Sequence, residues 1–465
     1  MGEILFLLIA TVLSVLIWIE KGSKKLPWFF AGVLLFPQTI ILLEKPYMPF
    51  PRLIIFVLFL TMIFQESNLW KKYRTFPLHN TINFIFGLLL LIGLVDNRLN
   101  FFLKLYRPVY YFAENFLILY LTYHYIRKIE DVAFIYKKIL FIFILFSLYG
   151  VINYVGGESQ YTRFISETYK LIDFGNRYTD IGDARFRISS FAWHPIYYGY
   201  LLSVAITLTL FVLYSMKIVT RIRVIYGILL VLLVVNLIWT NSRTPLLAMI
   251  AGVMVFFVFG LELKRKLRLA LSGLLLVVLV SSLFPSAITL LDESINTFTA
   301  KGSKLEGSSV EMRDMQTLAS LKLFVENPYF GHGYGYIFED LGYSTDSEKK
   351  TSSKDFAGFE SFAYKLLIEQ GLAGIIGFVA FLFSLIRFLI KSRRKGKSNI
   401  RKLTFFSIGM VVSFFLFIFG TGDLGAFTFF MALLGINIKA IVLINNGVPQ
   451  KIINSTDLQL GSVPI

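Results

Sequence analysis

Four short segments of the sequence stand out because they combine polar or charged side chains that could do chemistry. In chain order they are Arg185 to Pro195, Asn241 to Arg243, Arg313 followed by Pro328 to Gly333, and Glu360 to Gly374. The first three contain arginine, whose planar guanidinium binds phosphate or carboxylate oxygens through two parallel hydrogen bonds. The fourth begins with a glutamate, which is ionised at neutral pH and can accept a proton. These side chains can bind anions and move a proton if the fold brings them together.

The composition excludes several other chemistries. The chain has no cysteine, which rules out disulfides, thiolate metal sites and a cysteine nucleophile. It has no D-x-D pair and no cluster of histidine with carboxylates, so no metal site is predicted. The run Gly331-His-Gly-Tyr-Gly335 does not follow a strand, so we interpret it as a turn and not as a nucleotide-binding loop.

The elements that must position these segments are apolar. Hydrophobic residues make up 56% of the 465 residues, charged residues 16%, and the mean hydropathy is +0.68. Apolar runs of about 17 to 22 residues recur along the chain, and a helix of that length crosses the roughly 30 Å of a bilayer core. We therefore predict an all-α integral membrane protein with about thirteen spans (twelve to fourteen). The expected spans are 3–20, 26–43, 50–64, 81–95, 109–126, 139–155, 195–215, 224–240, 244–261, 269–285, 371–390, 403–420 and 424–445.

Basic clusters predict the orientation of these spans. They fall in alternate connections, as expected when cytoplasmic loops carry the excess of lysine and arginine. Much of the net charge of +17 is assigned to those loops, so it does not indicate nucleic-acid binding. The amino terminus is then outside the cytoplasm, and two long connections, 156–194 and 286–370, are outside as well.

The predicted organisation has four parts. Residues 1–285 form the first ten spans with the outer loop 156–194, and residues 286–370 form the large outer loop that carries the later motifs. Residues 371–445 form the last spans, and residues 446–465 a cytoplasmic tail. The large loop contains its own helix, because Ser308-Ser-Val-Glu311 has the pattern of a capping box, and Asn327-Pro328 ends it.

The order of the four motifs resembles that of the O-antigen ligase and Wzy-type polysaccharide polymerase superfamily. The matching features are Ser242-Arg243 between two spans, Arg313 before a P-x-x-G-x-G segment, and the pair Glu360-Ser361 followed after nine residues by G-x-x-G. The motifs cover about residues 185–390, and the span pattern covers the whole chain.

The resemblance implies a multi-span bacterial glycosyltransferase. Its substrate is an undecaprenyl-pyrophosphate-linked oligosaccharide, polymerised into O-antigen, capsule or exopolysaccharide on the extracytoplasmic face of the cytoplasmic membrane. Direct displacement would invert the anomeric centre without metal or cofactor. The implied partners are the lipid-linked oligosaccharide, the bilayer, and a chain-length regulator and a flippase of the same pathway; nucleic acid is not expected.

The resemblance also assigns roles to individual residues. Arg187, Arg243 and Arg313 would bind the pyrophosphate of the donor, and Glu360 would act as the general base. Further candidates are Arg185, His194 and His332.

Several alternatives stay open from the sequence. Ligases of the superfamily begin the last motif with a histidine, whereas this chain has Glu360-Ser361, which favours a polymerase over transfer to another acceptor. A flippase for the same lipid-linked sugar would also have many spans, but the chain shows no internal repeat. The structural alternatives are a helix cap for His194, a snorkelling side chain for Arg243 and a solvated loop position for Glu360.

Overall fold

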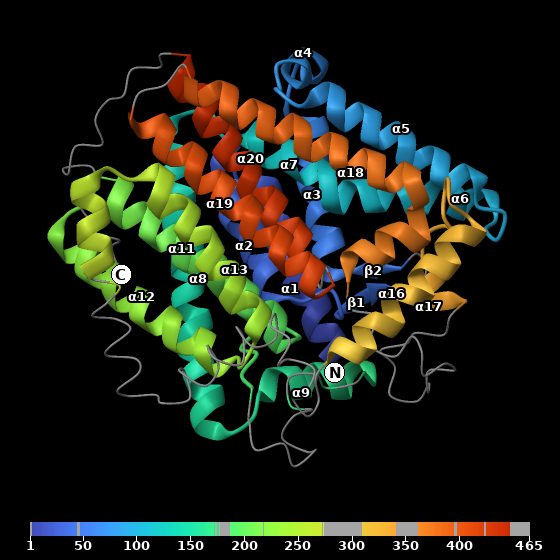
Figure 1. The fold of residues 1–465 in the computed structure, drawn as a ribbon, viewed down its shortest axis with the longest axis horizontal. Coiled ribbons are helices and arrows are strands. Elements are labelled where there is room, and N and C mark those ends of the chain that lie inside the picture. Colours follow the sequence, from blue (N-terminus) through green and yellow to red (C-terminus); the bar gives the residue numbers. More distant parts are fainter. Residues whose placement is uncertain are drawn as a thin grey trace.

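The described chain is a bundle of helices with one small sheet (Figure 1). The structure is a computed structural model, and it describes residues 2–43, 47–171, 173, 176, 187–216, 218–271, 273, 309–340, 361–394, 398–422 and 425–446. Its helices are α1 (Gly2–Ile19), α2 (Lys25–Leu35), α3 (Phe50–Gln65), α4 (Leu69–Arg74), α5 (His79–Val95), α6 (Phe101–Phe112), α7 (Ile118–Tyr125), α8 (Ile129–Gly156), α9 (Gln160–Tyr169), α11 (Pro195–Ser215), α12 (Thr220–Trp239), α13 (Arg243–Val255), α16 (Ser309–Glu326), α17 (Tyr336–Glu339), α18 (Phe362–Arg394), α19 (Ser398–Gly420) and α20 (Ala426–Asn445). The remaining elements are a 3₁₀ turn (Gly22–Lys24), two π-helical turns (Ala113–Leu117 and Phe256–Gly260), and the strands β1 (Ile41–Leu43) and β2 (Met48–Pro49).

The membrane character predicted from composition is confirmed. Among the described residues, eight helices are long and apolar enough to cross a membrane: α1, α8, α11, α12, α13 with its π-helical turn, α18, α19 and α20. Helices α3 and α5 are apolar but shorter. The count of thirteen spans stays a prediction, since most of the expected span 269–285 lies outside the described residues.

Some expected boundaries differ from the observed ones. The predicted span 26–43 is wrong at its end, because α2 stops at Leu35 and Phe36 is extended with φ −123°. The cause is Pro37, which disfavours helical geometry in the residue before it. The chain then forms β1, which pairs antiparallel with β2. Helix α18 differs in the other direction, since it begins at Phe362 and so ahead of the predicted start at 371.

Helices α11 and α20 form the centre of the bundle. Helix α11 is apolar around its whole circumference and almost wholly buried, packing against α12, α13 and α19. Its hydroxyls donate to the carbonyls one turn back, so no buried donor of Ser203, Thr207 or Thr209 is left unpaired. Ser203 also reaches the carbonyl of Pro245 on α13 at 2.7 Å. Small and hydroxyl-bearing residues thus let helix backbones approach closely, as is usual inside membranes.

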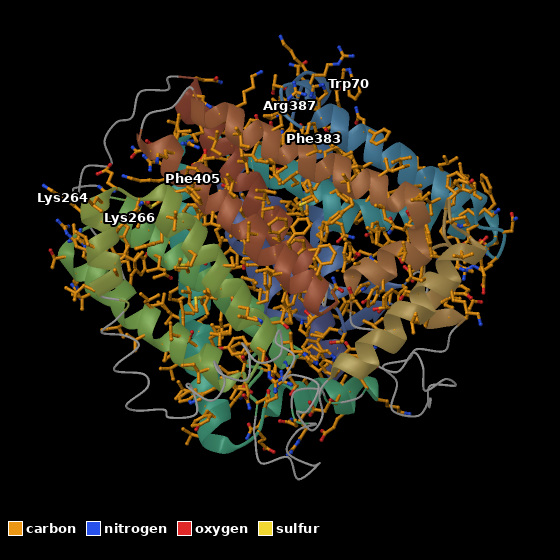
Figure 2. All side chains as sticks on the ribbon, in the orientation of Figure 1. Trp70, Lys264, Lys266, Phe383, Arg387 and Phe405 are labelled. Atoms are coloured by element: carbon orange, nitrogen blue, oxygen red, sulfur yellow. The ribbon has the colours of Figure 1, made fainter. Side chains whose placement is uncertain are left out.

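Labelled residues of two predicted cytoplasmic segments lie in the upper left part of the view. Lys264 and Lys266 lie at the left, and Trp70 of the basic helix α4 lies at the top, near Arg387 of α18 (Figure 2). Helix α9, in the connection predicted to be outside, lies at the opposite edge (Figure 1). We call the side of the molecule that carries Lys264, Lys266 and α4 the basic face, and helix α9 lies on the other side.

Candidate functional site

The first two motifs form a single joint. The Arg187 guanidinium donates from Nε to the carbonyl of Thr240 at 3.0 Å and from Nη2 to the hydroxyl of Ser242 at 2.7 Å. The neighbouring backbone N–H of Ile188 donates to the carbonyl of Trp239 at 3.2 Å. These bonds satisfy carbonyls that α12 leaves open at its carboxyl end. Arg187 therefore fixes the turn 240–242, which we call the Ser242 turn.

The Ser242 turn places Arg243 at the first position of α13. The chain reverses there because Asn241 adopts a left-handed conformation with φ 47°, and Ser242 precedes the helix in extended geometry. A cation at the start of a helix faces the positive end of the helix dipole, which is unfavourable unless an anion is close. The position of Arg243 therefore suits the binding of an anion at this end of the bundle.

His194 is a helix cap. Its Nδ1 accepts a hydrogen bond from the backbone N–H of Ile196 at 3.1 Å, and Pro195 occupies the first helical position of α11. This is the structural role that the sequence left open for His194.

The third and fourth motifs also meet. Helix α18 is interrupted at Gly371, where φ is 58° and ψ is −152°, and we call this interruption the Gly371 break. Residues 328–335, which we call the glycine loop, bind to both sides of it. His332 N–H donates to the carbonyl of Ile368 at 2.8 Å, and Leu372 N–H donates to the carbonyl of Pro328 at 2.9 Å. The loop thus satisfies backbone groups that the break removes from the helix.

Glycine is required at the break itself. A Cβ added at Gly371 would lie 2.6 Å from the backbone nitrogen of Gly331 and 2.8 Å from the carbonyl oxygen of Pro328. Any side chain there would push the glycine loop away, and the positive φ would be strained as well. The glycines of the third and fourth motifs are therefore needed for the same backbone contact, between the glycine loop and the Gly371 break.

His332 ties the glycine loop to α16. Its Nε2 lies 2.9 Å from the carbonyl oxygen of Leu323, and its Nδ1 lies 3.1 Å from the side-chain amide of Asn327. The ring stacks on Tyr336 with centroids 4.3 Å apart. Both ring nitrogens contact protein groups at the carboxyl end of α16, so His332 positions this helix.

Sequence reasoning missed Glu369, which lies directly beside the break. The residue is 2% exposed, and its carboxylate accepts hydrogen bonds from the backbone N–H groups of Gly335 and Ile337. Its Oε1 has no hydrogen-bond partner in the part of the chain that the structure describes. A carboxylate directly before an apolar run was the signal that could have identified it.

A buried ion pair lies near the two joints and was also missed. Arg52 of α3 and Glu114 of the π-helical turn are 2.6 Å apart, and the Arg52 guanidinium stacks on the ring of Tyr110 at 3.8 Å. Thr428 of α20 donates to the carbonyl of Glu114 at 3.1 Å. The pair therefore locks α3, the π-helical turn and the start of α20 together, and removing one partner would leave a buried charge.

The α19–α20 connection links the two joints. A Cβ added at Gly420, the last residue of α19, would lie 2.6 Å from the methyl group of Thr244, next to Arg243. At the start of α20, Phe427 packs against Phe362, the first residue of α18, with ring centroids 5.6 Å apart. The last residue of α19 thus contacts the segment next to the Ser242 turn, and the start of α20 contacts the start of α18.

Three predicted site residues cannot be placed in full. Glu360 and Arg185 lie outside the described residues, although Ser361, next to Glu360, is buried at the start of α18. The backbone of Arg313 is in α16, as the capping pattern predicted, and its side chain is outside the described part. The roles predicted for these residues stay predictions.

Comparison with known families matches the segment that holds the last three motifs. A family model described as O-antigen ligase matches residues 228–379. This segment is similar to O-antigen ligases. The match runs from α12 through the Ser242 turn, α16 and the glycine loop into α18, and it confirms the resemblance to the O-antigen ligase and Wzy-type superfamily. It supports a membrane function of the O-antigen ligase or polymerase type. A search of curated proteins found no match.

Proposed function

We propose that the protein is an inverting glycosyltransferase that polymerises undecaprenyl-pyrophosphate-linked repeat units on the extracytoplasmic face of the bacterial cytoplasmic membrane. The observation that supports it most is that Arg187 binds the Ser242 turn and that the glycine loop binds the Gly371 break, within or beside the matched segment. A polymerase is favoured over a ligase because Glu360-Ser361 stands where ligases of the superfamily have a histidine.

The arginines provide the electrostatic part of the reaction. Arg243 and Arg313 bind the donor pyrophosphate and stabilise the charge that develops on it as it departs. Arg187 contributes by holding the Ser242 turn, since its two hydrogen bonds fix the backbone immediately before Arg243. A fixed cation does not have to reorganise during the reaction, which is why preorganisation lowers the barrier.

Glu360 provides the proton transfer. The acceptor hydroxyl of one repeat unit attacks the anomeric carbon of the other, and a new carbon–oxygen bond forms on the face opposite the leaving group. The bond between the anomeric carbon and the phosphate oxygen breaks, and undecaprenyl pyrophosphate leaves with the electron pair. Glu360 accepts the hydroxyl proton, a contribution of typically 10²- to 10⁴-fold in rate.

The test is a reconstitution with purified protein in nanodiscs and a synthetic lipid-linked repeat unit. The expected product is a ladder of lengthening glycans on a gel, with release of undecaprenyl pyrophosphate. A single transfer to an added lipid or protein acceptor, without a ladder, would instead identify a ligase. Failure to consume the lipid-linked substrate in either format would overturn the proposal.

Conservative arginine variants test the donor site in the same assay. Arg243→Lys and Arg313→Lys should each lose most of the ladder, because an ammonium group cannot make the two parallel bonds of a guanidinium. The matched control is Arg163→Lys in α9, whose ion pair with Glu158 is solvent-exposed. Full activity in both test variants would remove these arginines from the donor site.

A further inference from the structure

Two arginines, Arg98 in the turn between α5 and α6 and Arg107 in α6, contact the glycine loop and the end of α17. Arg107 donates from Nη1 to the carbonyl of Tyr334 and from Nη2 to the carboxylate of Glu339. Arg98 binds the Asp96 carboxylate at 2.8 Å and also pairs with Asp340, just after α17. The ion pairs Arg98–Asp340 and Arg107–Glu339 thus connect segments that lie more than two hundred positions apart in the sequence.

The two ion pairs that reach α17 are partly exposed. The side chains of Arg98 and Arg107 are 27% and 12% exposed, whereas those of Asp340 and Glu339 are 45% and 52% exposed. The Asp96 carboxylate, which also binds Arg98, is 1% exposed. Arg98 also lies over the ring of Tyr336, with its guanidinium carbon 5.2 Å from the centroid. Water screens the outer carboxylates, whereas the buried carboxylate of Asp96 holds Arg98 in place.

The two arginines explain the glycine spacing of the third motif. At Gly333, where φ is 89°, an added Cβ would overlap the Asp96 carboxylate and lie 2.8 Å from Nη2 of Arg98. At Gly335, where φ is 82°, it would lie 2.8 Å from Nη1 of Arg107. The loop backbone therefore lies directly against the arginine pair. The same glycines that suggested a turn in the sequence are required for this close approach.

The contact extends to the helix that carries Arg313. The loop is held by the arginines on one side and by the Gly371 break on the other. His332, in its middle, binds the carboxyl end of α16 through Leu323 and Asn327. Movement of the loop would consequently move α16.

We propose that Asp96, Arg98 and Arg107 form a clamp that positions the glycine loop and α16 for the reaction. The clamp residues are positioning residues: they act through the loop and do not touch the substrate. The activity arm of this inference rests on the proposed function, because α16 carries the predicted donor ligand Arg313. The structural arm, the placement of α16, does not depend on the reaction.

The distance between α16 and the rest of the bundle tests the structural arm. The chain has no cysteine, so spin labels can be attached to a single introduced pair, Glu167→Cys on α9 and Lys322→Cys on α16, both at exposed positions. In the labelled parent, we expect one narrow distance distribution by electron paramagnetic resonance. In the double variant Arg98→Ala with Arg107→Ala, the distribution should broaden or shift. Arg163→Ala, which removes an exposed outer ion pair, is the matched control and should leave it unchanged.

Enzyme kinetics test the activity arm. Displacement of catalytic groups by about 1 Å can cost up to about 100-fold in rate, so the double variant should lose between about 10-fold and 100-fold in kcat/KM for the lipid-linked donor. The apparent KM for that donor should rise, whereas simple loss of folded protein would lower activity at an unchanged KM. Arg107→Lys, which keeps the charge opposite Glu339, should recover part of the activity and is the milder variant if the double variant does not fold.

A glycine substitution gives an independent check. Gly333→Ala should broaden the same distance distribution, because it forces the loop off the Asp96–Arg98 pair. An added Cβ at Gly87, on α5, would meet nothing within 4 Å, so the control Gly87→Ala should have no effect. An unchanged distribution in the double variant and in Gly333→Ala, or a changed distribution with unchanged donor kinetics, would overturn the clamp. Inactivity of the parent protein would count against the proposed function alone, since the distance measurements would still decide the clamp.

Discussion

Two carboxylates of the fourth motif, Glu360 and Glu369, stand nine residues apart in the sequence. Glu369 is buried in α18 and accepts hydrogen bonds from the backbone N–H groups of Gly335, the last residue of the glycine loop, and of Ile337 in α17. Glu360 precedes the first residue of α18 and belongs to the motif that aligns with the histidine of ligases. A base must reach the substrate hydroxyl, whereas a carboxylate held by backbone N–H groups inside the protein is committed to the fold. Substitution of each residue in turn therefore distinguishes a catalytic role, expected for Glu360, from a structural role, expected for Glu369.

We predict that Glu360→Gln and Glu369→Gln fail in different ways. Glu360→Gln should keep its folding and donor binding but lose about 10²-fold or more in turnover, because an amide cannot accept the hydroxyl proton. Glu369→Gln should instead lower the melting temperature, since the carboxylate that holds Gly335 and Ile337 is replaced by a weaker acceptor. Turnover in the reconstituted assay and thermal unfolding in detergent measure the two effects. A stable Glu360→Gln protein with an unchanged rate of ladder formation would exclude Glu360 as the base.

The sequence was informative about residues that carry a local pattern. The capping role of His194 follows from its place before Pro195, and the end of α16 follows from Asn327-Pro328. The ion pairs were not predictable, since Arg52 meets Glu114, and Arg107 meets Glu339, only through the tertiary fold. Charge pairing between distant segments leaves no periodic signal in a single sequence.

At the scale of the elements, helix boundaries also depend on tertiary contacts that a single sequence does not reveal. The expected start of the span at 371 coincides with the Gly371 break, because the apolar run begins there. The helix continues on the other side of the break to Phe362, since the glycine loop supplies the backbone partners that the break removes. Tertiary contact thus extends an element beyond what its own sequence indicates.

A different element joint lies at the basic face. Glu66 follows the end of α3 and is 2.6 Å from Lys72 of α4 and 2.6 Å from Arg127, which follows α7. Burial would by itself raise the pKa of Glu66, but the hydrogen bond from Lys72 and the charge of Arg127 outweigh it and hold the pKa below its ordinary value. A carboxylate with a lowered pKa stabilises the folded state above the pKa of the unfolded chain, and this stabilisation is lost as the pH falls through the folded pKa.

We predict a pH-dependent cost for Glu66→Gln. At pH 7 the variant should be less stable by about 1 kcal/mol, because both cationic partners are partly exposed and screened by water. The difference should diminish as the pH falls below the ordinary carboxyl pKa of 4.5, where the parent carboxylate also becomes protonated. Thermal unfolding between pH 7 and pH 3 measures this, with the exposed Glu167→Gln as control. A stability difference that stays constant over the whole range would show that the charge of Glu66 is not involved.

At the scale of the whole molecule, charge is distributed unequally between the two ends. Lys264, Lys266 and Arg387 mark the basic face together with α4 (Figure 2). At the other end, Arg98, Arg107 and Arg163 are each paired with carboxylates, so these arginines add little net positive charge there. Arginines in the loops predicted to lie outside the cytoplasm are therefore compatible with the positive-inside rule, which concerns the excess of basic residues in short loops. The ion pairs also explain why these arginines are present at this end of the molecule, which the composition alone does not explain.

This distribution predicts which face is exposed to the cell exterior. Cysteines introduced at Glu167 and Glu326, both exposed and in the connections predicted to be outside, should react in intact cells with a maleimide that does not cross the membrane. Cysteines introduced at Lys71 and Lys391, exposed on the basic face, should react only after the membrane is permeabilised. The absence of native cysteine removes background labelling. Reaction of the second pair alone in intact cells would invert the orientation, and the proposed site would then face the cytoplasm, where an extracytoplasmic polymerase has no role.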